Sequence, residues 1–205
     1  MSEIQAVVFD LYETLVYSRI RTNPYRRLFI DLGFQPQSIE YLQARGIAFT
    51  ESFGSLADFV QRIKPDFSLS LESYEKDIDD AKKSVVLYPE TVDVLTILKE
   101  RGFRLGLISN LAFPYKEPFF RLGLAEYFHE VIFSCDVGFS KPDKRIYENI
   151  LMGFYIERSR ILMTGDTLEA DVLGPQRVGM RAVHLDRSGT TLKSISTLHG
   201  IFDYL

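Results

Sequence analysis

Polar side chains follow three short apolar runs of this sequence. The runs cover residues 5–10, 104–109 and 160–166, and the polar residues at their ends are Asp10, Ser109, Asn110 and Asp166. A carboxylate can attack an electrophile or bind a hard cation such as Mg²⁺, and a hydroxyl or amide can bind the oxygens of an anion. These residue types could together bind a divalent cation and an anion such as a phosphate.

Two further charged residues lie in loops after later runs. Lys141 lies in the loop Ser-Lys-Pro-Asp at 140–143, and Asp171 comes five residues after Asp166. Ligands of open α/β sheets bind outside the carboxyl ends of the strands. If the strands are parallel, three acids, a hydroxyl and a lysine meet at one edge, where they can bind a divalent cation and a phosphate together.

The elements that must position these residues are five short apolar runs without polar alternation. They cover residues 5–10, 104–109, 130–134, 160–166 and 181–186. Such runs are typical of parallel strands buried on both faces. Helical spacing lies between the later runs, over residues 89–102, 144–152 and 168–178. We therefore predict an α/β fold, a Rossmann-like open parallel sheet flanked by helices.

The segment after the first strand is too long to be a simple crossover. Residues 17–87 carry helically spaced apolar pairs, namely Leu28/Leu32, Ile39/Leu42, Phe59/Ile63 and Ile78/Ala81. A structureless loop of this length is improbable in a compact domain. We predict a helical-bundle cap of about four helices over residues 17–87, inserted into a core domain of residues 1–16 and 88–205. The phenylalanines of the insertion (Phe29, Phe49, Phe53 and Phe59) are expected in its core.

Composition excludes several classes of function. The 205 residues carry a net charge of −4, which argues against nucleic-acid binding. No stretch has the roughly 20 apolar residues that cross a bilayer. The single cysteine, Cys135, allows no internal disulfide, so we expect a cytoplasmic protein. The sequence does not indicate the oligomeric state.

Four motifs in order resemble those of the haloacid dehalogenase superfamily of hydrolases, subfamily I with a helical C1 cap. They are VVFDLYETLV around Asp10, LGLISN around Ser109, FSKPD around Lys141 and LMTGDTLEAD around Asp166 and Asp171. The motif-bearing core covers about two-thirds of the chain, and the insertion lies where the C1 cap of that family lies.

The resemblance implies a role for each motif residue. Asp10 would attack phosphorus and form an aspartyl-phosphate that water hydrolyses. The Asp10 carboxylate, the Tyr12 carbonyl and Asp166 would bind Mg²⁺. The residues that would contact the phosphorylated small-molecule substrate are Ser109, Asn110 and Lys141. Asp171 would act from behind, on Lys141 or on a metal-bound water.

Tyr12 departs from the pattern of most phosphatases of this family. They carry a second Asp at this position, which protonates the leaving alkoxide. A positioned general acid contributes on the order of 10²–10⁴-fold to the rate. Metal binding through the backbone carbonyl of residue 12 does not depend on its side chain, so protonation of the leaving group is the step that the substitution affects.

The same tyrosine resembles the L-2-haloacid dehalogenases, which release halide without a metal. Those enzymes share the D-x-Y motif, the Ser109-Asn110 pair, and a lysine with a tyrosine six residues on, here Lys141 and Tyr147. They place serine where this chain has Asp166. The fourth motif therefore favours a Mg²⁺-dependent phosphatase, with the dehalogenase as the alternative.

A second alternative is a catalytically weakened member of the family that binds a ligand or a protein. The Tyr12 substitution motivates it. The presence of Asp10, Lys141, Asp166 and Asp171 together argues against it.

Overall fold

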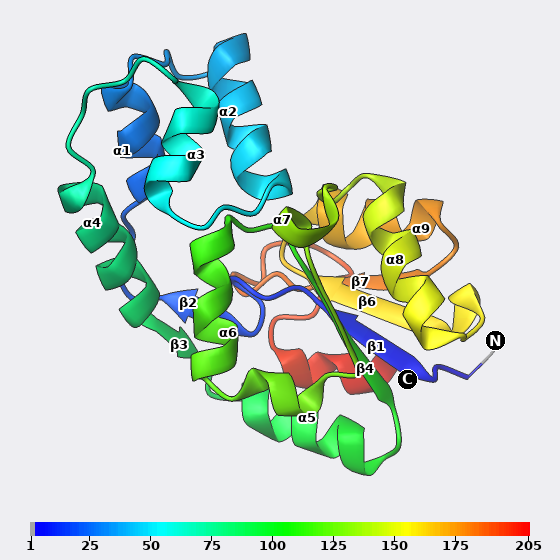
Figure 1. Ribbon diagram of the computed structural model, residues 1–205. Coiled ribbons are helices and arrows are strands. Elements are labelled where there is room, and N and C mark those ends of the chain that lie inside the picture. The colour runs from blue at the N-terminus through cyan, green and yellow to red at the C-terminus, as the bar shows by residue number, and fades with distance from the viewer. Residues whose placement is uncertain (1–2) are drawn as a thin grey trace.

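The computed structural model describes residues 3–205, and a five-stranded sheet forms its centre (Figure 1). The strand order is β5-β4-β1-β6-β7, and each neighbouring pair is parallel. The strands are β1 (Ala6–Phe9), β4 (Arg104–Ser109), β5 (Glu130–Phe133), β6 (Ile161–Gly165) and β7 (Arg181–His184). The predicted Rossmann-like α/β fold is confirmed.

Alternating residues of β1 divide the apolar core between the two faces of the sheet. Ala6 and Val8 face the side covered by α8 (Lys144–Phe154), and Val7 and Phe9 face the side covered by α5 (Thr91–Glu100). Both faces of the sheet are therefore buried against apolar side chains. This explains why the strands lack polar alternation.

The remaining helices of the core are short. They are α6 (Glu117–Arg121), α7 (Ser134–Val137), α9 (Gly174–Arg177), the π-helical turn η4 (Leu168–Leu173) and the 3₁₀ turns η1 (Phe113–Lys116), η2 (Leu124–Tyr127), η3 (Arg158–Arg160) and η5 (Leu198–Tyr204). The helix predicted over 168–178 is thus η4 followed by α9. Among residues 3–205, no helix is both long and apolar enough to span a bilayer.

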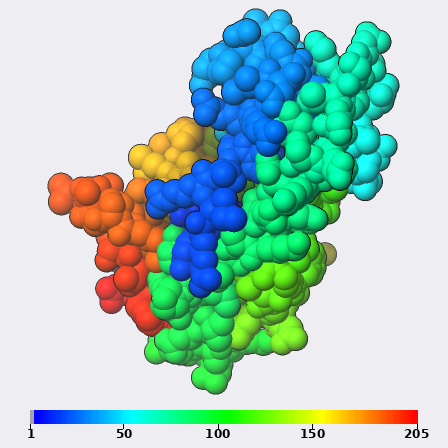
Figure 2. All heavy atoms as spheres, turned by 90° about the vertical axis from the view of Figure 1, so that its left-hand side faces the viewer, coloured from blue at the N-terminus to red at the C-terminus, as the bar shows by residue number. Residues whose placement is uncertain are grey.

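The insertion stands at one end of the molecule, in blue and cyan in Figure 2. It leaves and re-enters the core through β2 (Val16–Ser18) and β3 (Val85–Leu87), an antiparallel pair that the sequence patterns did not predict. Between them lie four helices, namely α1 (Pro24–Asp31), α2 (Ile39–Thr50), α3 (Leu56–Ile63) and α4 (Glu72–Lys83). The division into core and cap at residues 17 and 87 stays our proposal, and a separate apolar cluster formed mainly by these helices, with Ala112 and Tyr115 of the core against it, supports it.

Helix α2 packs in the insertion through small side chains, Ala44 and Ala48. Its larger residues Ile39 and Leu42 are 71% and 47% exposed, so this apolar pair does not contribute to the core of the insertion. The prediction that Phe49 is a core residue is wrong, because it lies outside the apolar cluster and lines the cavities below the helix. The small residues let α2 approach its neighbours closely, while Leu42 and Phe49 line the cavity between α2 and the sheet.

Phe59 tests the core of the insertion because it is fully buried among Tyr25, Phe29 and Phe53. We expect Phe59→Ala to lower the free energy of unfolding by about 3–5 kcal/mol, measured by urea denaturation. Phe120→Ala is the control, since Phe120 is 58% exposed, and we expect it to cost less than about 1 kcal/mol. Equal costs for the two variants would contradict this packing.

Candidate active site

The predicted site residues meet at the carboxyl edge of the sheet. Asp10 follows β1, Asn110 follows β4 and Asp166 follows β6, so three neighbouring strands deliver side chains to the same edge. Helix α2 of the insertion lies across from this edge. The cavity between them has a volume of about 590 Å³ and is lined by all of the predicted site residues, namely Asp10, Tyr12, Ser109, Asn110, Lys141, Asp166 and Asp171.

The ammonium of Lys141 is the centre of the site. Its Nζ donates hydrogen bonds to Asp10 Oδ1 at 2.6 Å, to Asp171 Oδ1 at 2.7 Å and to the Ile108 carbonyl at 2.8 Å. Its side chain is 2% exposed. The three donors of a lysine ammonium are therefore all used, and two of the acceptors are carboxylates, which compensates the cost of burying the charge.

Asn110 holds the backbone of Lys141 at two points. Its Nδ2 donates to the Lys141 carbonyl, and its Oδ1 accepts from the Lys141 N–H, both at 2.8 Å. The amide thus uses both of its ends on the loop that carries the ammonium. We infer a positioning role for Asn110, while its predicted contact with substrate stays a prediction.

Asp171 is fixed from two sides. Its Oδ1 binds Lys141, and its Oδ2 accepts a hydrogen bond from the Thr167 N–H at 2.9 Å. Gly165 at the end of β6 leaves room for this carboxyl, because a Cβ there would lie 2.4 Å from Asp171 Cγ. A side chain at position 165 would displace the acid that supports the ammonium.

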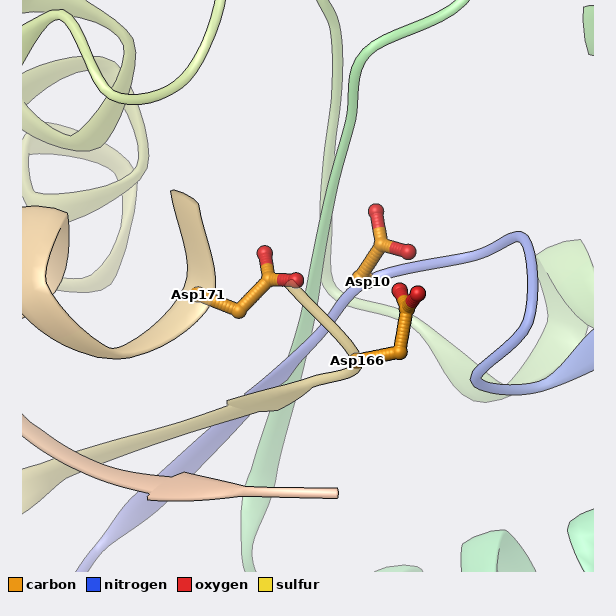
Figure 3. Close-up of side chains that lie close together, drawn as sticks. All are labelled: Asp10, Asp166 and Asp171. Carbon is orange, nitrogen blue, oxygen red and sulfur yellow. The ribbon is translucent and has the colours of Figure 1, made fainter. Parts of the chain in front are cut away.

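Asp10, Asp166 and Asp171 point toward one another (Figure 3), and each offers a carboxylate oxygen within 4.8 Å of the others. Asp171 already uses both oxygens, so Asp10 and Asp166 are the acids left to bind a cation. Two carboxylates with room for water suit Mg²⁺. The residues fit the predicted ion, whereas the contribution of the Tyr12 carbonyl stays a prediction.

The electrostatics of this cluster favour a bound cation. Burial raises the pKa of Asp10 to about 7, with Asp171 adding to the rise and Lys141 opposing it. Burial and the charge of Asp171 also raise the pKa of Asp166. Burial lowers the pKa of Lys141, but the two carboxylates outweigh it, so the pKa is raised and the ammonium stays charged. A divalent cation offsets the repulsion between the acids.

Ser109 and Tyr12 complete the predicted set. Ser109 is 1% exposed, and among residues 3–205 its hydroxyl has no hydrogen-bond partner, which leaves it free for a ligand. The Tyr12 hydroxyl donates to the Tyr115 carbonyl at 3.0 Å. The Tyr12 ring therefore lines the cavity at Asp10, and its hydroxyl proton is already donated to a backbone carbonyl of the core turn η1.

Two residues of α2 were missed by the sequence patterns. Arg45 and Phe49 both line the cavity, and the Arg45 guanidinium lies 5.6 Å from the Phe49 ring centroid. Within residues 3–205, Arg45 has no carboxylate partner, so its charge is available to an anion. Spacing of four along a helix was the one available signal, and it does not tell a cavity-facing pair from a solvated pair.

A second cavity of about 580 Å³ continues from the first beneath the insertion. The residues shared by both cavities are Tyr12, Leu42, Arg45, Phe49 and Asn110. Six aromatic side chains line the second cavity, namely Tyr12, Tyr25, Phe29, Tyr41, Phe49 and Tyr115. A ligand held at Asp10 can thus extend into an aromatic chamber.

Replacing Lys141 leaves two buried acids without their ammonium. We expect Lys141→Met to lower the free energy of unfolding by about 3–5 kcal/mol at pH 8. The loss will be smaller at pH 5.5, because Asp10, whose pKa burial already raises, takes up a proton in the folded state before it does so in the unfolded chain. Urea denaturation at both pH values measures this. Lys76→Met, on the exposed side of α4, is the control, and a loss that grows toward low pH would contradict the geometry.

Magnesium binding will depend on pH through Asp10. Only the ionised carboxylate binds the cation, and the pKa of Asp10 without metal is about 7. The apparent affinity for Mg²⁺ will therefore fall about tenfold per pH unit below pH 7 and level off above pH 8. Calorimetric titration from pH 5.5 to 8.5 measures this, and an affinity that is constant over the range would argue against Asp10 as a ligand.

Curated proteins that are named phosphatases are similar to this chain in sequence. Glyceraldehyde 3-phosphate phosphatase of Methanothermobacter thermautotrophicus is 29% identical over 228 residues, which cover 97% of this chain and 99% of that protein. Phosphoserine phosphatase of Thermus thermophilus is 36% identical, over 49% of this chain and 41% of its own.

Solved structures share the fold. The HAD phosphatase of Thermococcus onnurineus has a TM-score of 0.69 at 24% identity, covering 98% of this chain and 97% of that one. The 2-haloacid dehalogenase of Pseudomonas syringae pv. Tomato DC3000 has a TM-score of 0.68 at 22% identity, with the same coverage. The sequence also matches the profile of the haloacid dehalogenase-like hydrolases over residues 4–179. The chain therefore belongs to the haloacid dehalogenase-like hydrolases.

Proposed function

We propose that this hydrolase is a Mg²⁺-dependent phosphatase that cleaves a small phosphorylated metabolite through an aspartyl-phosphate on Asp10. The observation that carries the proposal is the buried ion-paired set of Asp10, Lys141 and Asp171, with Asp166 facing Asp10 across the cavity. The names of the two curated relatives, both phosphatases, support it. The buried free thiol of Cys135 supports a cytoplasmic location.

We assign each residue a task that fits this geometry. Lys141 engages Oδ1 of Asp10 and leaves Oδ2 to attack phosphorus. The free hydroxyl of Ser109 donates to a phosphoryl oxygen, and the charge of Lys141 stabilises the transferring group. Asn110 keeps the Lys141 loop in register with Asp10. Asp171 holds the ammonium from behind.

Asp10 and Asp166 would bind the Mg²⁺. When bound, the ion offsets the repulsion between the Asp10 carboxylate and the phosphoryl group. Attack by Oδ2 forms the aspartyl-phosphate and breaks the bond to the leaving group. Water then attacks the phosphorus of this intermediate, releases phosphate and restores Asp10.

Dehalogenation stays a second candidate because Tyr12 lines the site where most phosphatases of the family have an acid. A halide leaves without a proton. The ionised Asp166 in the same cavity would, however, repel a 2-halocarboxylate unless a cation neutralised it. The metal-dependent phosphatase accounts for this acid and the dehalogenase does not.

Asp10→Asn tests the nucleophile. With p-nitrophenyl phosphate and Mg²⁺, we expect phosphate release to fall at least about 10³-fold, because an amide cannot attack phosphorus.

Asp166→Ala tests the metal site. We expect this variant to lose Mg²⁺ binding in calorimetry and to lose activity with it, as the unmodified protein will when EDTA is added. Asp66→Asn, an exposed residue of the loop before α4, is the matched control.

The dehalogenase reading has its own assay. Chloride release from 2-chloropropionate in the presence of EDTA, with no phosphate release under any metal condition, would replace the phosphatase proposal. Phosphate release that is undiminished in Asp10→Asn would contradict the mechanism through an aspartyl-phosphate.

A further inference from the structure

Cleavage of an alkyl phosphate needs a proton for the leaving alkoxide. An aliphatic alkoxide is about as basic as hydroxide, whose parent water has a pKa of about 15.7, whereas a phenol ionises near pH 10. An aryloxide can therefore leave without help, and an alkoxide leaves slowly unless a positioned acid protonates it. The supply of such acids in the cavity thus limits which esters can react.

Every carboxyl group that lines the cavity at Asp10 within residues 3–205 already has a partner or a task. They are Asp10, Glu13, Asp166, Glu169 and Asp171. Lys141 engages two of them, and the acid opposite Asp10 belongs to the proposed cation site. None of these three is placed to give up a proton to a leaving group.

The two remaining acids point elsewhere. Glu169 is exposed and forms an ion pair with Arg177 at 2.6 Å. Glu13 is also exposed, and its Oε2 accepts a hydrogen bond from the Tyr88 hydroxyl at 3.1 Å. Both carboxylates thus act as acceptors for partners of their own.

Tyr12 is one of the five residues that line both cavities. Its hydroxyl proton is used on the Tyr115 carbonyl, 3.0 Å away. The ring of Tyr12 stands edge-on to the ring of Tyr115, with centroids 6.3 Å apart. The side chain thus forms a wall of the aromatic chamber and offers no free proton to a leaving group.

The chamber itself favours a ring. Its volume of about 580 Å³ lies within the range of pockets that take drug-sized ligands, and a three-carbon leaving group would fill little of it. Phe49 lies outside the apolar core of the insertion and lines both cavities, at the point where a leaving group passes from one to the other. Aromatic rings pack well against such walls.

From these observations we infer that the substrate is an aryl phosphate, a phosphomonoester of a phenolic hydroxyl whose ring occupies the aromatic chamber. The inference rests on the proposed phosphatase function and names its substrate class. Asp10 Oδ2 forms a bond to phosphorus as the P–O(aryl) bond breaks, and the aryloxide leaves with the electron pair and takes its proton from solvent. Water then cleaves the aspartyl-phosphate, so that the aryl phosphate and water become a phenol and phosphate.

Phenyl phosphate and benzyl phosphate form the matched pair for the test, since both carry one benzene ring and only the second leaves as an alkoxide. With Mg²⁺, we expect kcat/KM for phenyl phosphate to exceed that for benzyl phosphate by at least about 10²-fold. Comparable values, within tenfold, would overturn the inference because they would require an acid in the site.

Tyr12→Asp places a carboxyl group where both cavities meet. We expect it to raise kcat/KM for benzyl phosphate by about 10²-fold. The ratio of kcat/KM for phenyl phosphate to that for benzyl phosphate will therefore fall. Tyr12→Phe covers the case in which Tyr12→Asp does not fold. It removes the hydroxyl and will keep the substrate ratio of the unmodified protein, whereas a ratio that widens would identify the phenol as a proton donor and overturn the inference.

Phe49→Ala tests the chamber. We expect KM for phenyl phosphate to rise about 2- to 10-fold, with little effect on acetyl phosphate, whose leaving group is too small to reach the chamber. Phe120→Ala, an exposed phenylalanine outside both cavities, is the control. An equal rise in KM for both substrates would contradict the placement of the substrate ring in the chamber.

Acetyl phosphate also separates a failure of the aryl-phosphate inference from a failure of the proposed phosphatase function. Hydrolysis of acetyl or benzyl phosphate without hydrolysis of phenyl phosphate would overturn the aryl assignment and leave the phosphatase function standing. A chain that hydrolyses none of the three esters with Mg²⁺ would overturn the phosphatase function itself.

Discussion

The ammonium of Lys141, held between two buried carboxylates, is the interaction on which the rest of the site depends. Its side chain is 2% exposed, and its partners Asp10 and Asp171 are 11% and 1% exposed. Charges this far from water are stable only in close, fully hydrogen-bonded pairs. The end of β1 with Asp10, the loop that carries Lys141 and the π-helical turn that carries Asp171 must therefore stay in register with one another.

Two local features of the fold keep these segments in register. Asn110 binds the backbone of Lys141 through both ends of its amide, and Gly165 leaves the space that the Asp171 carboxyl fills. The parallel sheet brings the carboxyl ends of β1, β4 and β6 to a common edge. Asn110 and Asp171 can therefore both contact Lys141 there. Asp166 remains free to face Asp10, and these two acids form the proposed cation site beside the ion-pair network.

Tyr12 links the chemistry of the site to its shape. In place of an acid, the chain has a phenol whose proton is used on a backbone carbonyl and whose ring is a wall of the chamber. One residue thus removes a proton donor and adds aromatic surface at the place where the leaving group passes. Both effects favour the same kind of leaving group. A substrate of this class differs from the alkyl phosphates in the names of the relatives.

The sequence by itself determined the α/β class, the order of the strands along the chain and the residues at their ends, because buried parallel strands and short motifs are local patterns. Tertiary structure alone decided that Phe49 and Arg45 face the cavity, that Asn110 holds Lys141 and that the Tyr12 hydroxyl binds a carbonyl 103 residues away. These contacts depend on the path of the chain between distant segments. No spacing within one segment reports that path, since a helix face that meets a cavity carries the same residue types as one that meets water.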